Sequence, residues 1–157
     1  MNCAEFVATR GAAVELWVQT WYPQHPLFAA LAKHDYPTFA AQQLEERQSA
    51  LMPPFAHQAL VRAEARTQSA AQALLTLAAE AGADLPGREH LTIYPAVPMA
   101  IQRVANVERA QMLIESPSRR ALQVFLSAWQ AVLHDCRAHS DAKGVIRWAI
   151  DVDPLTI

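Results

Sequence analysis

Three stretches of the sequence, residues 57–66, 107–115 and 144–154, alternate apolar with polar side chains. Because successive side chains of a strand point to opposite faces of a sheet, this alternation predicts strands with one buried and one polar face. This shared apolar face is the predicted core of the domain. It would carry Ala59, Val61, Ala63, Ala65, Ala110, Met112, Ile114, Ile146, Trp148, Ile150 and Val152.

Two helices are expected between these strands. The alanine- and leucine-rich segment TQSAAQALLTLAAEAG, residues 67–82, favours a helix, and Gly82 is placed to end it. The other helix is expected to have Ser116 as its cap and Pro117 as its first residue, and to end near Arg137. Its buried stripe would consist of Leu122, Phe125, Leu126, Trp129, Leu133 and Cys136.

A further short strand is expected in HLTIYPAVPM, residues 90–99, where the prolines favour a sheet edge or an irregular crossing. The order of elements is then β-α-β-β-α-β, which is the split-βαβ pattern of ferredoxin-like domains. We therefore predict an α+β chain whose residues 53–157 form a ferredoxin-like domain.

Residues 1–52 follow a different plan. The segment AVELWVQTWY, residues 13–22, predicts a strand, and two helices are expected in HPLFAALAKHDY and YPTFAAQQLEERQSAL. Pro53 and Pro54 cannot continue the second helix, so we place a domain boundary there. Because the strand has no partner strands in this segment, we interpret residues 1–52 as an incomplete unit.

Composition indicates a folded domain with no global attraction to nucleic acid. Hydrophobic residues make up 52% and charged residues 18% of the 157 residues, and the net charge is −2. Two cysteines fit a reducing compartment better than a disulfide framework. We find no signal segment and no apolar run of about 18 residues that would predict a membrane helix, so a cytoplasmic protein without membrane contact is expected.

The polar face of the predicted sheet carries arginines interleaved with acids. It would display Arg62, Arg66, Arg109, Gln111 and Arg147 together with Glu64 and Asp151. One interpretation is a solvated face with paired charges. The other is a docking surface for nucleic acid or a neighbouring domain. The acids Asp151 and Asp153 are attributed to turn and edge solubility.

Arg119 and Gln123 lie one helical turn apart beside the predicted apolar stripe, whereas Arg120 points further away. A guanidinium and an amide near a helix start suit a carboxylate attached to a hydrophobic residue, such as an acidic peptide terminus. Ordinary first-turn surface residues are the alternative explanation.

Motifs for catalysis and metal binding are missing from the sequence. We find no Walker A loop, no Gly-rich dinucleotide turn and no nucleophile elbow. His134, Cys136 and His139 are spaced so that they scatter around a helix, whereas metal ligands must converge. We therefore predict no catalytic residues and no metal site.

Four segments, in order and at matching spacing, resemble the C-terminal region of the primosomal protein N′ (PriA) family of replication-restart helicases. They are VELWVQTWYPQHPLFAAL, YPTFAAQQLEERQSALMPPFAHQALVRAEA, PMAIQRVANVERAQMLIESPSRRALQ and IRWAIDVDP, and together they cover about residues 14–157. The resemblance implies that residues 1–52 are a remnant of the second helicase lobe and that residues 53–157 are the C-terminal domain.

The family moves along DNA in the 3′ to 5′ direction at the expense of ATP and reloads the replication machinery. Its ATP-binding loops, acidic Mg²⁺-binding motif and zinc-binding cysteines are not in this sequence, so a non-catalytic C-terminal fragment without cofactors is implied. ATP, magnesium and zinc would belong to the parent protein.

The family's C-terminal domain packs on the helicase core and helps to recognise branched DNA. The resemblance thus implies three kinds of partner: the rest of the helicase and the primosome proteins, forked DNA bound weakly by this piece alone, and the acidic, Phe-ending tail of single-stranded-DNA-binding protein. Arg119 and Gln123 match the family's tail-binding positions. Arg103 and Arg109 keep basic positions in the segment that crosses to the sheet.

Two other hypotheses remain open. The first is an independent ferredoxin-like domain that binds a small molecule or catalyses a reaction, which would require convergent polar groups in a pocket. The second is a degenerate fragment of only structural value, which would fold well and bind neither peptide nor forked DNA.

Overall fold

The structure is a computed structural model that describes residues 17–156. The chain divides into two compact units between Glu45 and Glu46. This division falls inside helix α3, Tyr36–Ser49. The domain boundary expected between residues 52 and 53 stays a prediction.

The first unit contains the two helices that its sequence predicts. Helix α2, Pro26–Ala32, begins with proline, and the His25 side chain caps it by accepting the Leu27 N–H at 3.2 Å. Helix α3 follows and has no buried residue. The sequence predicts a strand over residues 13–22, of which residues 13–16 lie outside the described residues. Residues 17–22 form no strand, so the prediction is wrong there. A strand needs a neighbouring strand for its backbone hydrogen bonds.

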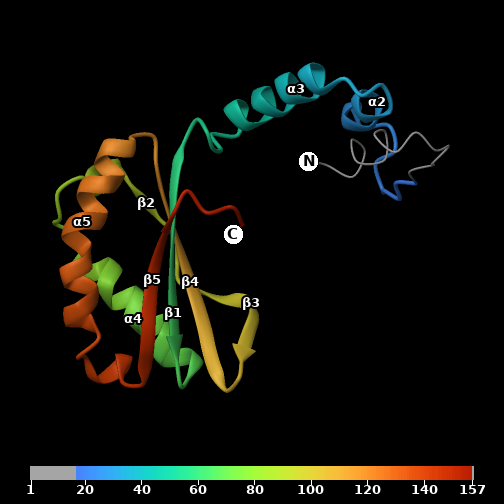
Figure 1. The fold of residues 1–157 in the computed structure, drawn as a ribbon. Helices are drawn as coiled ribbons and strands as arrows, with labels where there is room; N and C mark the ends of the chain where they lie inside the picture. Colours follow the sequence, from blue (N-terminus) through green and yellow to red (C-terminus); the bar gives the residue numbers. More distant parts are fainter. Residues whose placement is uncertain (1–16, 157) are drawn as a thin grey trace. The chain divides into compact units, whose positions relative to one another are not determined.

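The second unit is an antiparallel five-stranded sheet with two helices, and it confirms the α+β, ferredoxin-like prediction. The strands are β1 His57–Ala65, β2 Thr92–Ile93, β3 Val97–Val104, β4 Val107–Ser116 and β5 Val145–Val152. Their order is β2-β4-β1-β5, with β3 also paired to β4. Strand β4 thus separates β1 from β2, as the split-βαβ pattern requires. Figure 1 shows β1 between β5 and β4.

Helices α4, Gln68–Ala81, and α5, Arg119–Cys136, contribute to one core with the predicted apolar face of the sheet. Thr67 caps α4 through its hydroxyl, and Gly82 ends the helix. The centre of the core is aromatic, because the rings of Phe125 and Trp129 pack together with their centroids 5.4 Å apart. The indole N–H of Trp129 donates to the Ala78 carbonyl at 2.6 Å, which joins the two helices. The expected stripe of α5 is buried at Leu122, Phe125, Leu126, Trp129 and Leu133, with Cys136 partly covered.

The sheet edges differ from the sequence-based expectation. Ile146 and Val152 of β5 are 45% and 38% exposed, although alternation predicted that both lie in the core. Strand β5 is at the end of the sheet, and there the helical layer covers Trp148 and Ile150 only partly. The position of a strand in the sheet is a tertiary property that alternation does not encode.

The segment 90–99, predicted as one strand, contains β2 and the start of β3. Pro95 has no N–H to continue the ladder, and the chain resumes pairing with β4 only at Val97. Strand β3 then forms a hairpin with β4, and both turn residues, Ala105 and Asn106, have positive φ angles of 50° and 65°. This is the backbone conformation that suits a two-residue hairpin turn.

The start of α5 also differs from its prediction. Ser116 is buried as the last residue of β4, and its hydroxyl donates to the His90 carbonyl at 2.9 Å. The cap is Ser118, which accepts the Ala121 N–H at 3.2 Å, and the helix begins at Arg119. Either serine could cap a helix from sequence alone, and strand pairing of Ser116 with His57 decides between them.

Among residues 17–156, no helix combines the length and the apolar character that a membrane crossing requires.

Candidate functional site

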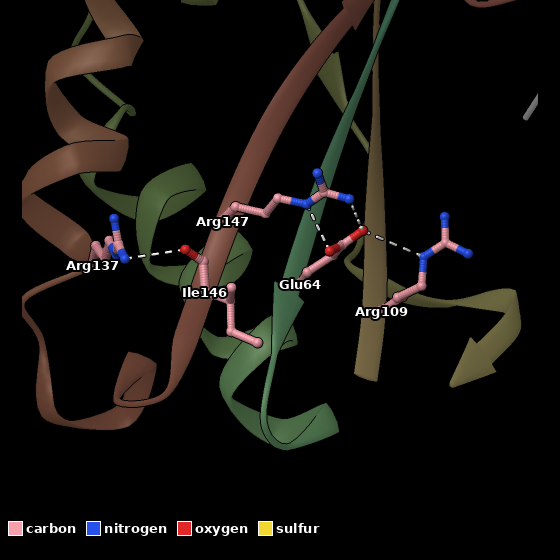
Figure 2. A network of polar contacts seen from close by, with 5 residues as sticks. All are labelled: Glu64, Arg109, Arg137, Ile146 and Arg147. Carbon is pink, nitrogen blue, oxygen red and sulfur yellow. Dashed lines mark hydrogen bonds and ion pairs between the residues drawn. The ribbon is translucent and has the colours of Figure 1, made fainter. Parts of the chain in front are cut away.

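A charge network crosses the polar face of the sheet and is centred on Glu64 of β1. Glu64 lies directly opposite Arg109 of β4 and Arg147 of β5 in the strand register. Its carboxylate accepts two hydrogen bonds from Arg147, at 2.7 and 2.9 Å, and lies 3.8 Å from Nε of Arg109 (Figure 2). The hydrogen bonds from Arg147 and the two positive charges lower the pKa of Glu64, and Glu64 raises the pKa of Arg147.

A second ion pair lies on the same face. Arg62 of β1 contacts Asp151 of β5 at 3.2 Å. Three of the predicted docking arginines, Arg62, Arg109 and Arg147, therefore have acidic partners within the sheet. This geometry agrees with the interpretation of a face with paired charges, and such internal pairing reduces the positive potential available to a phosphate backbone.

The other two predicted docking arginines lie apart from this network. Arg66 follows the end of β1 with an exposed side chain, its backbone N–H donates to the Gly144 carbonyl at 2.9 Å, and its guanidinium has no ion-pair partner among the described residues. Arg103 lies opposite Glu108 in the β3–β4 hairpin and contacts it at 3.6 Å. Because Glu108 is adjacent to Arg109 in the strand, Arg103 lies on the opposite face of the sheet from Glu64. The predicted set of five arginines is thus not one surface.

The start of α5 places the Arg119 guanidinium beside a carboxylate. Arg119 is the first residue of the helix, and its Nη2 donates to Oδ2 of Asp153 at 2.5 Å. Asp153 directly follows β5 and has a positive φ of 53°, and its backbone N–H donates to the Gln58 carbonyl at 2.9 Å. The end of β5 therefore presents a carboxylate to the start of α5.

Gln123 is exposed one turn after Arg119, as the sequence predicts. The Gln123 carbonyl accepts a hydrogen bond from Ser127, and within residues 17–156 its side-chain amide has no hydrogen-bond partner. Arg120 is also exposed, and it forms no ion pair with any described residue. Arg119 and Gln123 thus offer a guanidinium and an amide on consecutive turns of one helix.

An open cavity of about 420 Å³ lies at the other end of α5, between that helix and α4. Leu77 and Ala81 belong to its apolar lining, and Glu80, Asp135, Cys136 and His139 also border it. Burial raises the pKa of the Cys136 thiol.

His134, which the sequence places near Cys136 and His139, does not border this cavity. Its ring packs edge-on against Trp148, with ring centroids 5.1 Å apart. Within the described residues, no group of three or more His, Cys, Asp or Glu side chains is arranged to hold a metal ion.

Both aspartates after Ala149 pair with an arginine of another element, whereas the sequence predicts turn and edge solubility as their role. The paired-charge interpretation of the polar face includes Asp151, since alternation places it on that face with Arg62. No local signal exists for Asp153, because its partner Arg119 is 34 residues away in the chain.

Comparison with known proteins finds relatives that carry the same name in different bacteria. Replication restart protein PriA of Haemophilus influenzae is 34% identical over 142 residues, which cover 89% of this chain and 18% of that protein. The PriA proteins of Synechocystis sp. and Treponema pallidum are each 30% identical, again over 89% of this chain, and the matches cover 16% and 20% of those proteins. The chain therefore spans about a fifth or less of the length of these relatives.

The family described as the primosomal protein N C-terminal domain matches residues 48–155. This range contains the whole sheet, helices α4 and α5, and the ion pair between Arg119 and Asp153. The resemblance stated from the four sequence segments is therefore confirmed. This match covers more than half of the chain, and the chain therefore belongs to the primosomal protein N C-terminal domain family.

Proposed function

We propose that this chain is a non-catalytic docking region of a replication-restart helicase and that it binds the acidic, Phe-ending tail of single-stranded-DNA-binding protein through Arg119 and Gln123. The observation that carries this proposal is the contact between Arg119 and Asp153 at 2.5 Å. It supports a carboxylate ligand, because the guanidinium is accessible and is already oriented toward a carboxylate oxygen.

The surroundings of Arg119 favour the same chemistry. The start of a helix carries backbone N–H groups and a partial positive charge, both of which stabilise an anion. The Gln123 amide, one turn further along the exposed side of α5, can donate to a peptide carbonyl or carboxylate. A peptide that ends in an acidic, aromatic sequence offers the matching groups.

We propose a second role in docking the remainder of the helicase and the primosome proteins. Large apolar side chains support it within the first unit, where Trp21 is 95% exposed and Tyr22 and Tyr36 are also exposed. Isolated exposed aromatics are common, but this short segment carries several, which is typical of a contact surface. ATP hydrolysis, Mg²⁺ and Zn²⁺ are assigned in this proposal to other parts of the parent protein.

Forked DNA is a further proposed partner, bound weakly by this piece alone. The arginines of the sheet face, chiefly Arg109 and Arg147, are the candidate contacts. Their pairing with Glu64 supports a low affinity, because a phosphate must compete with that carboxylate.

The test of tail binding is fluorescence anisotropy with a labelled peptide that carries the tail sequence. Wild-type protein is expected to give saturable binding, and Arg119→Glu is expected to abolish it. Arg120→Glu is the matched control, since it makes the same charge change at the next residue of the helix. Gln123→Ala is expected to weaken binding about three- to tenfold, through loss of one hydrogen bond of ordinary strength, about 1 kcal/mol. Equal losses in Arg119→Glu and Arg120→Glu would indicate general charge attraction and contradict the assigned site.

A further inference from the structure

We infer that Asp153 is an internal competitor for the ligand of Arg119 and thereby sets the affinity of the proposed peptide site. This inference rests on the proposed function, because it assigns a regulatory residue to the same site. In the free protein the Asp153 carboxylate forms an ion pair with the Arg119 guanidinium. An incoming carboxylate must displace the Asp153 side chain to bind Arg119.

The ion pair is accessible enough to be exchanged. The side chains of Arg119 and Asp153 are 63% and 46% exposed, so a ligand can replace Asp153 without opening the core. Exposed ion pairs are weak because water and salt screen them. The competition is therefore modest, and removal of the Asp153 charge is expected to tighten peptide binding about two- to fivefold.

The position of Asp153 is held by the backbone and not only by the ion pair. Its N–H donates to the Gln58 carbonyl of β1 at 2.9 Å, immediately after β5 ends. A ligand that displaces the side chain thus leaves the Asp153 backbone in place, and the displaced carboxylate remains close to the site. This proximity gives the internal carboxylate a high effective concentration relative to a free peptide.

A positioning role predicts the opposite result. If Asp153 served to orient Arg119 for the ligand, removal of its charge would release the guanidinium into several rotamers and weaken binding. The direction of the change in affinity therefore separates the two roles.

Asp153→Asn is the principal variant, since asparagine tolerates a positive φ and keeps the size of the side chain. Asp153→Gly also permits the backbone conformation and removes the competing acceptor entirely. Asp151→Asn is the matched control, because it removes one acidic charge two residues earlier in the chain but its partner is Arg62 on the sheet face. Thermal unfolding of each variant verifies that the protein is folded.

The labelled tail peptide is titrated into all four proteins at the same ionic strength. Tighter binding by Asp153→Asn and Asp153→Gly, with Asp151→Asn close to wild type, is the expected result. Unchanged or weaker binding by both Asp153 variants, while the wild type binds, would overturn this inference and leave the proposed site intact. If neither the wild type nor the variants bind, the proposed site itself is refuted, and the inference with it.

Discussion

Glu64 and Arg147 face each other across strands β1 and β5 and are joined by two hydrogen bonds, at 2.7 and 2.9 Å. Arg109 approaches the same carboxylate from β4 on the other side. One acid therefore pairs with two arginines of the polar face and offsets part of their positive charge. We therefore expect substitution of this carboxylate to change both the stability of the domain and the affinity of the face for phosphates.

Substitution of Glu64 by glutamine is expected to lower the free energy of unfolding by about 1 kcal/mol at neutral pH, the upper part of the range for solvent-screened pairs. The arginines lower the pKa of Glu64 below its ordinary value of 4.5. A lowered pKa stabilises the folded protein above the unfolded-state pKa, and this contribution is lost as the pH falls through the folded-state pKa. Denaturant unfolding from pH 7 downward should therefore show the difference between wild type and Glu64→Gln shrinking below about pH 4.5. A difference that does not change with pH would contradict the assignment.

The same substitution tests the polar face as a DNA contact. Loss of Glu64 leaves Arg109 and Arg147 available for phosphates, so forked DNA is expected to bind more tightly and with a steeper dependence on salt concentration. The measurement is a titration at several ionic strengths. Glu108→Gln serves as the control, since it removes an equal charge near Arg103 on the other face. Equal gains in both variants would show that tighter binding is not specific to this face of the sheet.

Trp129→Phe is expected to destabilise the domain by about 1–2 kcal/mol, because it removes buried ring area and the hydrogen bond to Ala78. The loss stays moderate since the Ala78 carbonyl also accepts the Gly82 N–H at 3.0 Å. A Cβ on Gly82 would lie 2.8 Å from the Trp129 indole. Gly82→Ala should therefore destabilise the wild type more than it destabilises Trp129→Phe. A double-mutant cycle by chemical denaturation measures this coupling, and additive effects would contradict the contact.

Gly87→Ala is expected to cost more stability than Gly144→Ala. Both glycines have positive φ, at 88° and 103°, so both substitutions introduce backbone strain of about 1 kcal/mol. A Cβ on Gly87 would in addition lie 2.6 Å from the Ala121 carbonyl oxygen of α5, whereas the nearest atom at Gly144 is the Arg66 Cβ at 3.6 Å. Melting temperatures of the two variants decide the order, and equal shifts would show that strain alone accounts for both.

Local sequence patterns were sufficient to predict which face of β1 and β4 and which side of α5 lie in the core. Alternation in β1 and β4 placed Ala63 and Ala110 in the core and Glu64 and Arg109 on the polar face, because the side-chain period of a strand is fixed by its backbone. The apolar stripe of α5 was predictable for the same reason, since the helical period fixes which residues lie together.

Which elements meet depends on the packing of the whole domain, and local sequence patterns do not encode it. Ile146 obeys the alternation of β5 but is exposed, because its strand lies at the end of the sheet. Ser116 has the chemistry of a helix cap, yet its pairing with His57 makes it the end of β4. The contact between Arg119 and Asp153 depends on where β5 ends relative to α5. Periodicity acts over a few residues and fixes the direction of a side chain, whereas a partner 34 residues away is brought close only when the whole sheet and its helices pack together.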